Sequence, residues 1–182
     1  MFRPGLLSGV AVALAGPARA AIERELAGLE ADVRRVAPVS DEDAPPGASG
    51  AHALVVDAAA AFAATAAAGD PDELAPLRAA ADGAWVAIRS VANAAWIGPG
   101  EPGGKVVLVA PRPADGPHAE AARAALENLA RTLSIEWARY GIRTTAIAPG
   151  RDTTDEDVAR LVAYLVSEAG DYFSGTRLDL GR

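Results

Sequence analysis

The chain has 182 residues, a net charge of −7 at pH 7 and no cysteine. This length is enough for one domain with its own core. The absence of cysteine excludes disulfides and thiolate metal sites. The acidic balance without a basic run argues against nucleic acid as a partner, and the two distant histidines give no basis for a metal centre. The sequence has no run of 18 or more apolar residues, so it predicts no helix that spans a membrane.

The first predicted element is a buried strand over residues 9–14, where β-branched side chains alternate with smaller ones. An alternative for residues 1–21 is a signal peptide, because an early Arg3 and an apolar run precede a cleavage-like Ala-Arg-Ala. Cleavage would delete the strand, so we favour the strand and a cytoplasmic protein. A turn at Gly16 then leads into a helix with Pro17 in its first turn.

A second strand is predicted over residues 32–36, and an acidic, turn-rich and mobile loop follows around residues 38–50. Residues 52–59 contain a third apolar strand with Asp57 near its end. Open α/β sheets bind ligands beyond such strand ends, but an exposed carboxylate without a ligand is the simpler interpretation. The alanine-rich residues 58–68 predict no function.

A strong helix start follows at Asp70, with Pro71 next and Glu73 three residues after the cap. Apolar side chains then recur at helical spacing as far as Val91. Glycines and prolines end this element at residues 98–104.

Residues 103–150 contain a strand–helix–strand pattern, which predicts two parallel strands joined by a right-handed crossover. The strands are residues 105–109 and 144–148, and the second strand stops at a Pro-Gly pair. The helix between them has three stripes, one charged (Glu120, Arg123, Glu127, Arg131), one apolar (Ala122, Leu126, Leu129, Leu133, Trp137) and one of small residues (Ala121, Ala125, Asn128, Thr132). A further capped helix and a last strand over residues 174–181 complete the chain.

The string RAALENLARTLSIEWARYGIRTTAIAPG resembles the short-chain dehydrogenase/reductase (SDR) family, and the resemblance extends over nearly the whole chain with two internal deletions. It implies a Rossmann-like, doubly wound α/β domain over residues 1–182, with a parallel sheet of about six strands. It also implies that the two long helices build a dimer interface, as they do in this family; packing of these helices within one chain is the alternative.

The resemblance places four residues at the family's catalytic positions. Ala80, Pro111, Ala119 and Arg123 stand where active members have asparagine, serine, tyrosine and lysine. In active members the tyrosine exchanges a proton with the carbonyl oxygen, assisted by the lysine. We therefore expect no catalytic residue here, and we interpret Arg123 as part of a surface charge pair. His118 is the one nearby replacement, but its offset turns it about 100° around the helix.

The family's glycine-rich phosphate loop is also altered. Only Gly16 is kept, and Ala20 and Ile22 replace two glycines at positions where side chains would meet a phosphate. Arg19 is expected to be a solvated first-turn arginine, although it could attract an anion. Thr154 stands where the family often contacts the nicotinamide, but a helix cap explains it more simply.

These substitutions and Asp57, which replaces a family asparagine, predict that the chain binds no cofactor and that NAD(P) enters only through a partner subunit. We expect an inactive subunit that assembles with a complete SDR, as a heterodimer or heterotetramer, or that forms a homodimer. Two alternatives remain: an NAD(P)-dependent oxidoreductase with a site rebuilt from His118, Asp57 or Arg123, and a small-ligand-binding module. No metal, nucleic acid or membrane partner is expected.

Overall fold

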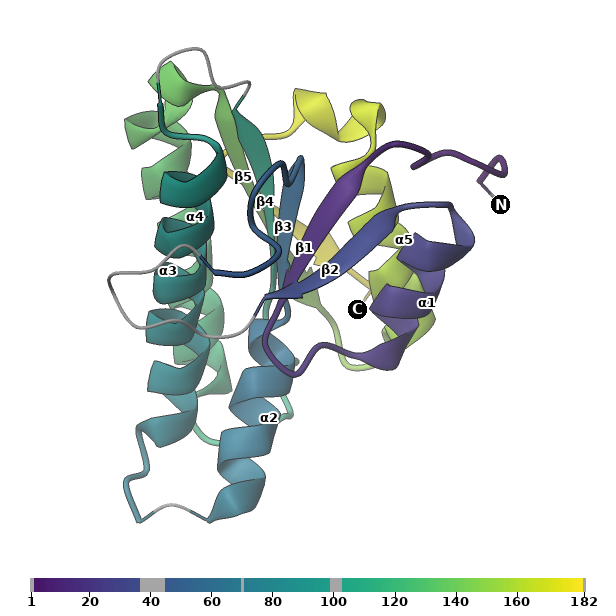
Figure 1. Ribbon diagram of the computed structural model, residues 1–182. Coiled ribbons are helices and arrows are strands. Elements are labelled where there is room, and N and C mark those ends of the chain that lie inside the picture. The colour runs from purple at the N-terminus through teal and green to yellow at the C-terminus, as the bar shows by residue number, and fades with distance from the viewer. Residues whose placement is uncertain (1, 37–44, 70, 99–102, 182) are drawn as a thin grey trace.

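The centre of the structure is a sheet of six parallel strands (Figure 1). This computed structural model describes residues 2–36, 45–69, 71–98 and 103–181. The strands lie in the order β2-β1-β3-β4-β5-β6, so the order reverses between β1 and β3. Their bounds are β1 Ala11–Ala15, β2 Asp32–Val36, β3 Ala53–Val56, β4 Gly104–Val109, β5 Ile142–Pro149 and β6 Thr176–Leu180. The predicted doubly wound α/β fold with about six strands is confirmed.

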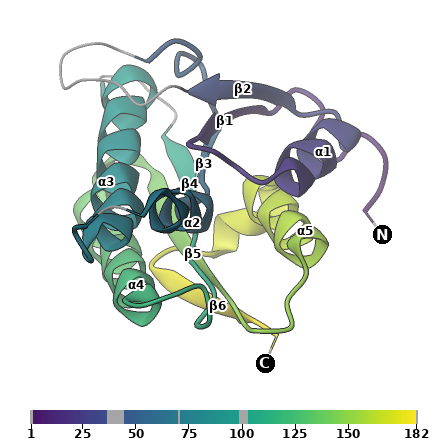
Figure 2. The same ribbon diagram turned by 90° about the horizontal axis from the view of Figure 1, so that it is seen from below.

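Helices cover both faces of the sheet, as the views of Figures 1 and 2 show. Helices α1 and α5 cover one face, whereas α3 and α4 cover the other, and α2 extends beyond the carboxyl ends of the strands beside α3. Their bounds are α1 Ala20–Gly28, α2 Ala58–Ala68, α3 Ala75–Ala95, α4 Ala119–Glu136 and α5 Asp155–Val166, with short 3₁₀ helices η1 Ala138–Tyr140 and η2 Glu168–Tyr172.

Strand β1 shows why the central strands are apolar on both sides. All five of its residues are buried. Val12 and Leu14 pack in the core under α1 and α5, whereas Ala13 and Ala15 pack in the core under α3 and α4. Side chains alternate between the faces of a strand, so a sheet covered on both faces needs apolar residues at every position.

Several element boundaries differ from those predicted. Strand β1 begins at Ala11, and β3 ends at Val56. Helix α1 begins at Ala20, three residues after Pro17, so the prediction that Pro17 lies in its first turn was wrong. Helix α3 begins at Ala75 because the Asp72 side chain accepts the backbone N–H of Leu74 (3.0 Å) and closes a turn instead. The predicted cap, Asp70, lies outside the described residues, as do positions 38–44 of the predicted mobile loop.

The alanine-rich segment forms helix α2, which the sequence analysis did not predict. Alanine has the highest intrinsic helix propensity, so an alanine run favours a helix wherever its ends are capped. The Asp57 side chain caps its start, and Gly69, in the left-handed conformation with φ of 69°, ends it. Phe62 is its fully buried anchor. The alanine-rich segment of low sequence complexity is therefore a regular helix.

Trp96 fixes the C-terminal end of α3 against the start of β4. Its side chain is 1% exposed, and its Nε1 donates to the Ala51 carbonyl (2.6 Å). The indole lies so close to Gly104 that an added Cβ would stand 2.1 Å from Trp96 Cε2. Only glycine fits at this position.

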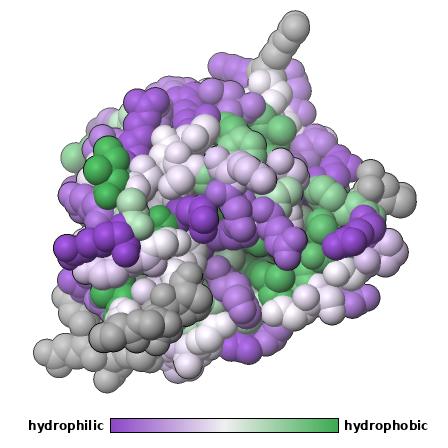
Figure 3. Space-filling view, turned by 90° about the horizontal axis from the view of Figure 1, so that it is seen from above, coloured by the Kyte–Doolittle hydropathy of each residue, from purple (hydrophilic) through white to green (hydrophobic). Residues whose placement is uncertain are grey.

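Lys105, the next residue of β4, ties the same amino-terminal edge of the sheet to the end of α5. Its Nζ donates to the carbonyls of Val166 (3.3 Å) and Ser167 (2.6 Å) and pairs with Asp171 (2.6 Å). A cation at the C-terminal end of a helix is favourable because the helix dipole is negative there. Hydrophilic side chains spread over this end of the molecule between smaller apolar patches (Figure 3).

Candidate functional site: the carboxyl edge of the sheet

Asp57 lies immediately after β3, at the point where the strand order reverses. It is 1% exposed, so the expectation of an exposed carboxylate was wrong. One oxygen accepts the N–H of Ala60 (3.1 Å) and caps α2, and the other accepts the N–H of Arg19 (2.9 Å). Burial raises the pKa of Asp57, although the Arg19 guanidinium and the two backbone donors act in the opposite direction. This carboxylate is part of the internal structure.

Arg19 is the residue before α1, and its side chain is not solvated as expected. The side chain is 11% exposed, with Nε 3.3 Å from Asp57 Oδ2 and Nη1 3.3 Å from Asp155 Oδ1. Arg19 is therefore paired with two carboxylates of the same chain.

Asp155, the first residue of α5, also forms an ion pair with a second arginine, Arg112. Arg112, in the loop after β4, places Nη2 2.8 Å from Asp155 Oδ1 and 2.9 Å from the Thr153 carbonyl. The Arg112 hydrogen bond, assisted by the Arg19 guanidinium, lowers the pKa of Asp155. Because the folded-state pKa is depressed, this stabilisation is present above the unfolded pKa of about 3.9 and is lost as the pH falls through the folded value.

Arg19, Asp57, Arg112 and Asp155 thus form one ionic network along the carboxyl edge. Its members come from four places in the chain: the start of α1, the end of β3, the loop after β4 and the start of α5. In doubly wound sheets this edge, beside the reversal of strand order, is where ligands bind. In this chain the network fills part of that edge.

The three uncharged residues at the family's catalytic positions are all buried. Ala80 is fully buried in α3, Ala119 is 1% exposed at the start of α4, and Pro111 is buried after β4. Alanine and proline side chains have no group that could transfer a proton, so these three positions supply no acid or base.

Arg123 is buried, and its interpretation as a surface residue was wrong. It is 5% exposed, and its Nη1 donates to the carbonyls of Pro111 (2.7 Å) and Pro149 (2.8 Å), at the ends of β4 and β5. The expected pairing with Glu120 is retained, with Nε 3.4 Å from Oε2. Arg123 therefore satisfies two strand-end carbonyls beside the network. The remainder of the charged stripe pairs as predicted, with Glu127 and Arg131 2.8 Å apart.

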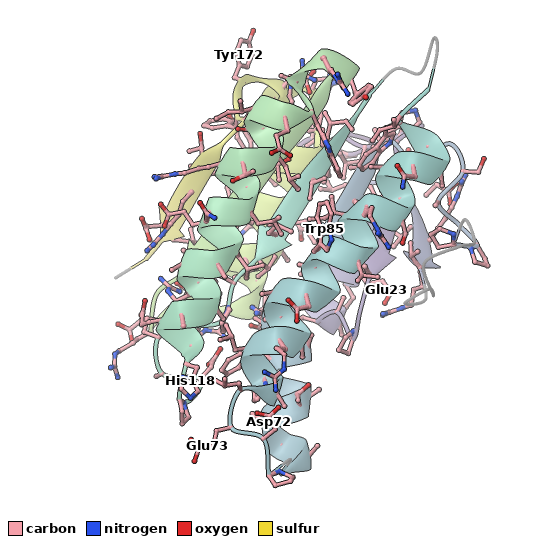
Figure 4. All side chains as sticks on the ribbon, turned by 90° about the vertical axis from the view of Figure 1, so that its left-hand side faces the viewer. Glu23, Asp72, Glu73, Trp85, His118 and Tyr172 are labelled. Carbon is pink, nitrogen blue, oxygen red and sulfur yellow. The ribbon has the colours of Figure 1, made fainter. Side chains whose placement is uncertain are left out.

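His118 precedes α4 in a left-handed conformation, with φ of 65°. It is exposed and makes no side-chain hydrogen bond to cap the helix. Figure 4 shows it beside the N-terminal end of α4. Among the described residues, His118 has no hydrogen-bond partner that would orient it as a proton donor.

The altered glycine loop differs in detail from the sequence-based interpretation. Gly16 has φ of 81°, and a side chain there would be strained by the backbone. Ala20 is exposed at the first turn of α1, but Ile22 is fully buried in the core beneath that helix. The expectation that Ile22 would meet a phosphate was therefore wrong. The Asp57 carboxylate takes the backbone N–H at the start of α1 instead.

Thr154 is a helix cap, as predicted. Its Oγ1 accepts the N–H of Asp157 (3.1 Å), and the Asp157 carboxylate accepts the N–H of Thr154 (3.2 Å), which completes a capping box at the start of α5.

An apolar cavity of about 370 Å³ lies between the ends of the strands, α2 and α3. Gly16, Asp57, Ala80 and Gly83 are among the residues that line it. Its volume falls within the range of about 300–1,000 Å³ that is usual for small-molecule sites. A Cβ added at Gly83 would meet no atom within 4 Å, so this helical position faces open space.

Two further kinds of site were sought in the described residues. They contain no group of three or more His, Cys, Asp or Glu side chains that could hold a metal ion. Over the same ranges, no helix has the length and apolar character needed to cross a membrane.

Comparison with known sequences gives short matches. No protein-family model matches the sequence. A probable 2,4-dienoyl-CoA reductase of Bacillus subtilis is 34% identical over 87 aligned positions, which cover 32% of this chain and 34% of that protein. An uncharacterized oxidoreductase of Caenorhabditis elegans, F53C11.3, is 41% identical over 49 positions, 27% of this chain and 16% of that protein. The matches thus span about a third of the first relative's length and about a sixth of the second's.

Comparison with solved structures extends over the whole chain. A citronellol catabolism dehydrogenase (AtuB) from Pseudomonas aeruginosa matches with a TM-score of 0.72 and 21% identity, over 99% of this chain and 96% of that chain. BdcA (YjgI) from E. coli matches at 0.71 and 20% identity, over 96% and 100%. A mutant of a Serratia marcescens short-chain dehydrogenase/reductase matches at 0.70 and 21% identity, over 96% and 97%. The chain therefore has the fold of the short-chain dehydrogenases/reductases.

Proposed function

We propose that this chain is a non-catalytic subunit with an SDR-like oxidoreductase fold, which binds no dinucleotide by itself and assembles with a complete SDR. The observation that carries the proposal is the ionic network, because it fills part of the carboxyl edge, at the start of α1, with side chains of the chain itself.

The catalytic positions support the absence of turnover. Reduction of a carbonyl requires a proton donor beside the oxygen, and Ala80, Pro111 and Ala119 have none. Arg123 uses Nη1 to bind two backbone carbonyls. The alternative of a rebuilt enzyme loses support. Both oxygens of Asp57 already accept backbone N–H groups, and His118 is exposed at the N-terminal end of α4.

The residues at the start of α1 do not fit a dinucleotide. A diphosphate at a helix N-terminus is bound by free backbone N–H groups and the positive helix dipole. Here the Arg19 N–H is bonded to the Asp57 carboxylate, and Asp155 adds a second negative charge nearby. A diphosphate would meet two carboxylates, so the start of α1 does not fit the diphosphate of a dinucleotide.

We expect NADH and NADPH to leave the melting temperature of the isolated chain unchanged. Millimolar nucleotide at a micromolar site would add about 4 kcal/mol of stability. That would raise the melting temperature by several degrees in a domain of this size. The measurement is a thermal melt at increasing nucleotide concentration, with a complete SDR as the positive control.

A clear shift with the isolated chain would contradict the proposal. The variant Gly83→Leu then identifies the cause, because its side chain would enter the apolar cavity. A shift that this variant abolishes would favour the alternative of a small-ligand-binding module. A shift that persists would favour a rebuilt cofactor site.

The outer surface of α3 and α4 supports the assembly part of the proposal. Trp85 on α3 is 39% exposed and lies 6.0 Å, centroid to centroid, from Trp137. Figure 4 shows Trp85 on the side of α3 that faces away from the sheet. The small residues Ala121, Asn128 and Thr132 of α4 are exposed as well. Small side chains permit close approach of a second pair of helices.

We expect Ala121→Arg to weaken assembly at least tenfold, because a long charged side chain would prevent that approach. Ala64→Arg, at an exposed position of α2, is the matched control and should have no effect. The complex mass is measured by native mass spectrometry after co-expression with complete SDRs of the same genome. A stable monomer that recruits none of them would contradict the assembly; a homodimer sensitive to Ala121→Arg would keep the interface and change the partner.

A further inference from the structure

A second cavity, of about 330 Å³, lies at the amino-terminal edge of the sheet, opposite to the ionic network. It is lined by residues just before β1 and β3, by the first residues of β4 and β5, and by η2. Figure 3 shows this end of the molecule. The volume falls within the usual range of small-molecule sites, about 300–1,000 Å³. None of the described residues that line it belongs to the family's catalytic or phosphate-loop positions.

One charged pair in this lining is already satisfied. Lys105 Nζ lies 2.6 Å from Asp171 Oδ1 and also donates to the carbonyls of Val166 and Ser167. An ammonium group has three N–H donors, so these three acceptors use all of them. The charges of Lys105 and Asp171 therefore cancel, and Lys105 has no donor left for a ligand.

Arg143 and Glu168, which also line the cavity, are not paired. Arg143 is aligned with Lys105 across β4 and β5, so both side chains leave the sheet on the face that α5 covers. Arg143 is half-buried, and Glu168, the first residue of η2, is exposed. Within the described ranges, neither side chain forms a hydrogen bond or an ion pair, with the other or with a third residue. The cavity thus has one unpaired cation and one unpaired anion.

We propose that this cavity binds a small zwitterion, whose carboxylate pairs with Arg143 and whose ammonium group pairs with Glu168. A ligand with a negative charge alone would be opposed by Glu168 and Asp171, and a ligand with a positive charge alone by Arg143 and Lys105. A zwitterion offers an opposite charge to each unpaired group. The inference goes beyond the proposed function, because it assigns a ligand to the edge of the sheet that the ionic network does not reach.

His52 adds an uncharged donor to the lining. Its Nδ1 accepts the N–H of Ala11 (2.9 Å), so the ring proton is on Nε2. This hydrogen bond holds the ring against the start of β1. The site therefore has donors for a carboxylate in both a guanidinium and an imidazole, and guanidinium binds carboxylate through two parallel hydrogen bonds.

The test titrates the full chain with three linear zwitterions, 4-aminobutanoate, 5-aminopentanoate and 6-aminohexanoate. Because Arg143 and Glu168 do not pair with each other, the two charges of the ligand need a spacer, and the series varies its length. We expect at least one of them to bind with a millimolar dissociation constant, followed by the amide signals of Arg143 and Glu168 in two-dimensional NMR. Pentanoate and pentylammonium each carry one of the two charges and should bind about ten times more weakly or less.

Three variants assign the charges. In Arg143→Gln the zwitterion should bind no better than pentylammonium, and in Glu168→Gln no better than pentanoate. Arg151→Gln removes the same charge at an exposed position after β5, at the opposite edge, and should leave binding unchanged. The inference is overturned if none of the three zwitterions binds, if either singly charged probe binds as tightly, or if binding survives the loss of Arg143 or Glu168. These outcomes are independent of the nucleotide and assembly measurements.

Discussion

Replacing Leu126 by aspartate is expected to destabilise the protein by about 5 kcal/mol or more. Leu126 lies on the apolar stripe of α4 and is fully buried in the core between that helix, α3 and the sheet. The variant loses the apolar contacts and also places a carboxyl group where no water reaches. Since whole domains are stable by about 5–15 kcal/mol, we expect little folded protein at room temperature.

Two variants make this result interpretable. Ile135→Asp introduces the same residue on the same helix, but its position is 78% exposed, so the free energy of unfolding should change little. Leu126→Ala should cost about 2–5 kcal/mol and remain measurable by urea unfolding. Equal stabilities for Leu126→Asp and Ile135→Asp would show that α4 is rotated from the orientation described.

The second large effect is expected at Gly104, where alanine should cost about 3 kcal/mol. Its Cβ would stand 2.1 Å from the Trp96 indole, which is fixed by burial and by its bond to Ala51. Neither the ring nor the strand can move without disturbing the core. The measurement is urea unfolding, with Gly28→Ala as the control, because an added Cβ there meets no atom within 4 Å.

A double-mutant cycle separates the clash from other effects of the alanine. Trp96→Ala removes the ring atoms nearest to Gly104, at the cost of the Nε1 hydrogen bond to Ala51. If the clash causes the loss, Gly104→Ala should cost much less in the Trp96→Ala background. Strictly additive losses would contradict this explanation.

The sheet could be predicted from the sequence because its strands are apolar on both faces and bounded by glycine and proline. The segments at residues 32–36 and 105–109 were located to within one residue at either end. Helix starts were less accurate, since local hydrogen bonds decide them. The turn closed by Asp72 shortened α3. The alanine run of α2 shows no period by which to choose between helix and coil.

The charged residues of the site were harder to predict. Arg19, Asp57 and Arg123 were interpreted one at a time, and a charged residue considered alone is expected at the surface. Their burial depends on partners distant in the sequence. Arg112 and Asp155 were not identified, although each closely follows a strand of the predicted parallel sheet. Because such strands end at one edge, residues just after them should have been compared as a group.

The ionic network has a kinetic consequence. Arg19 and Asp155 are 136 positions apart, so their contact closes about three quarters of the chain into a loop. Closing so long a loop costs conformational entropy before any contact offsets it. We therefore expect these ion pairs to form after the sheet has assembled, later than the transition state of folding. Interactions of this kind mainly slow unfolding. The network thus lengthens the lifetime of the folded state more than it accelerates folding.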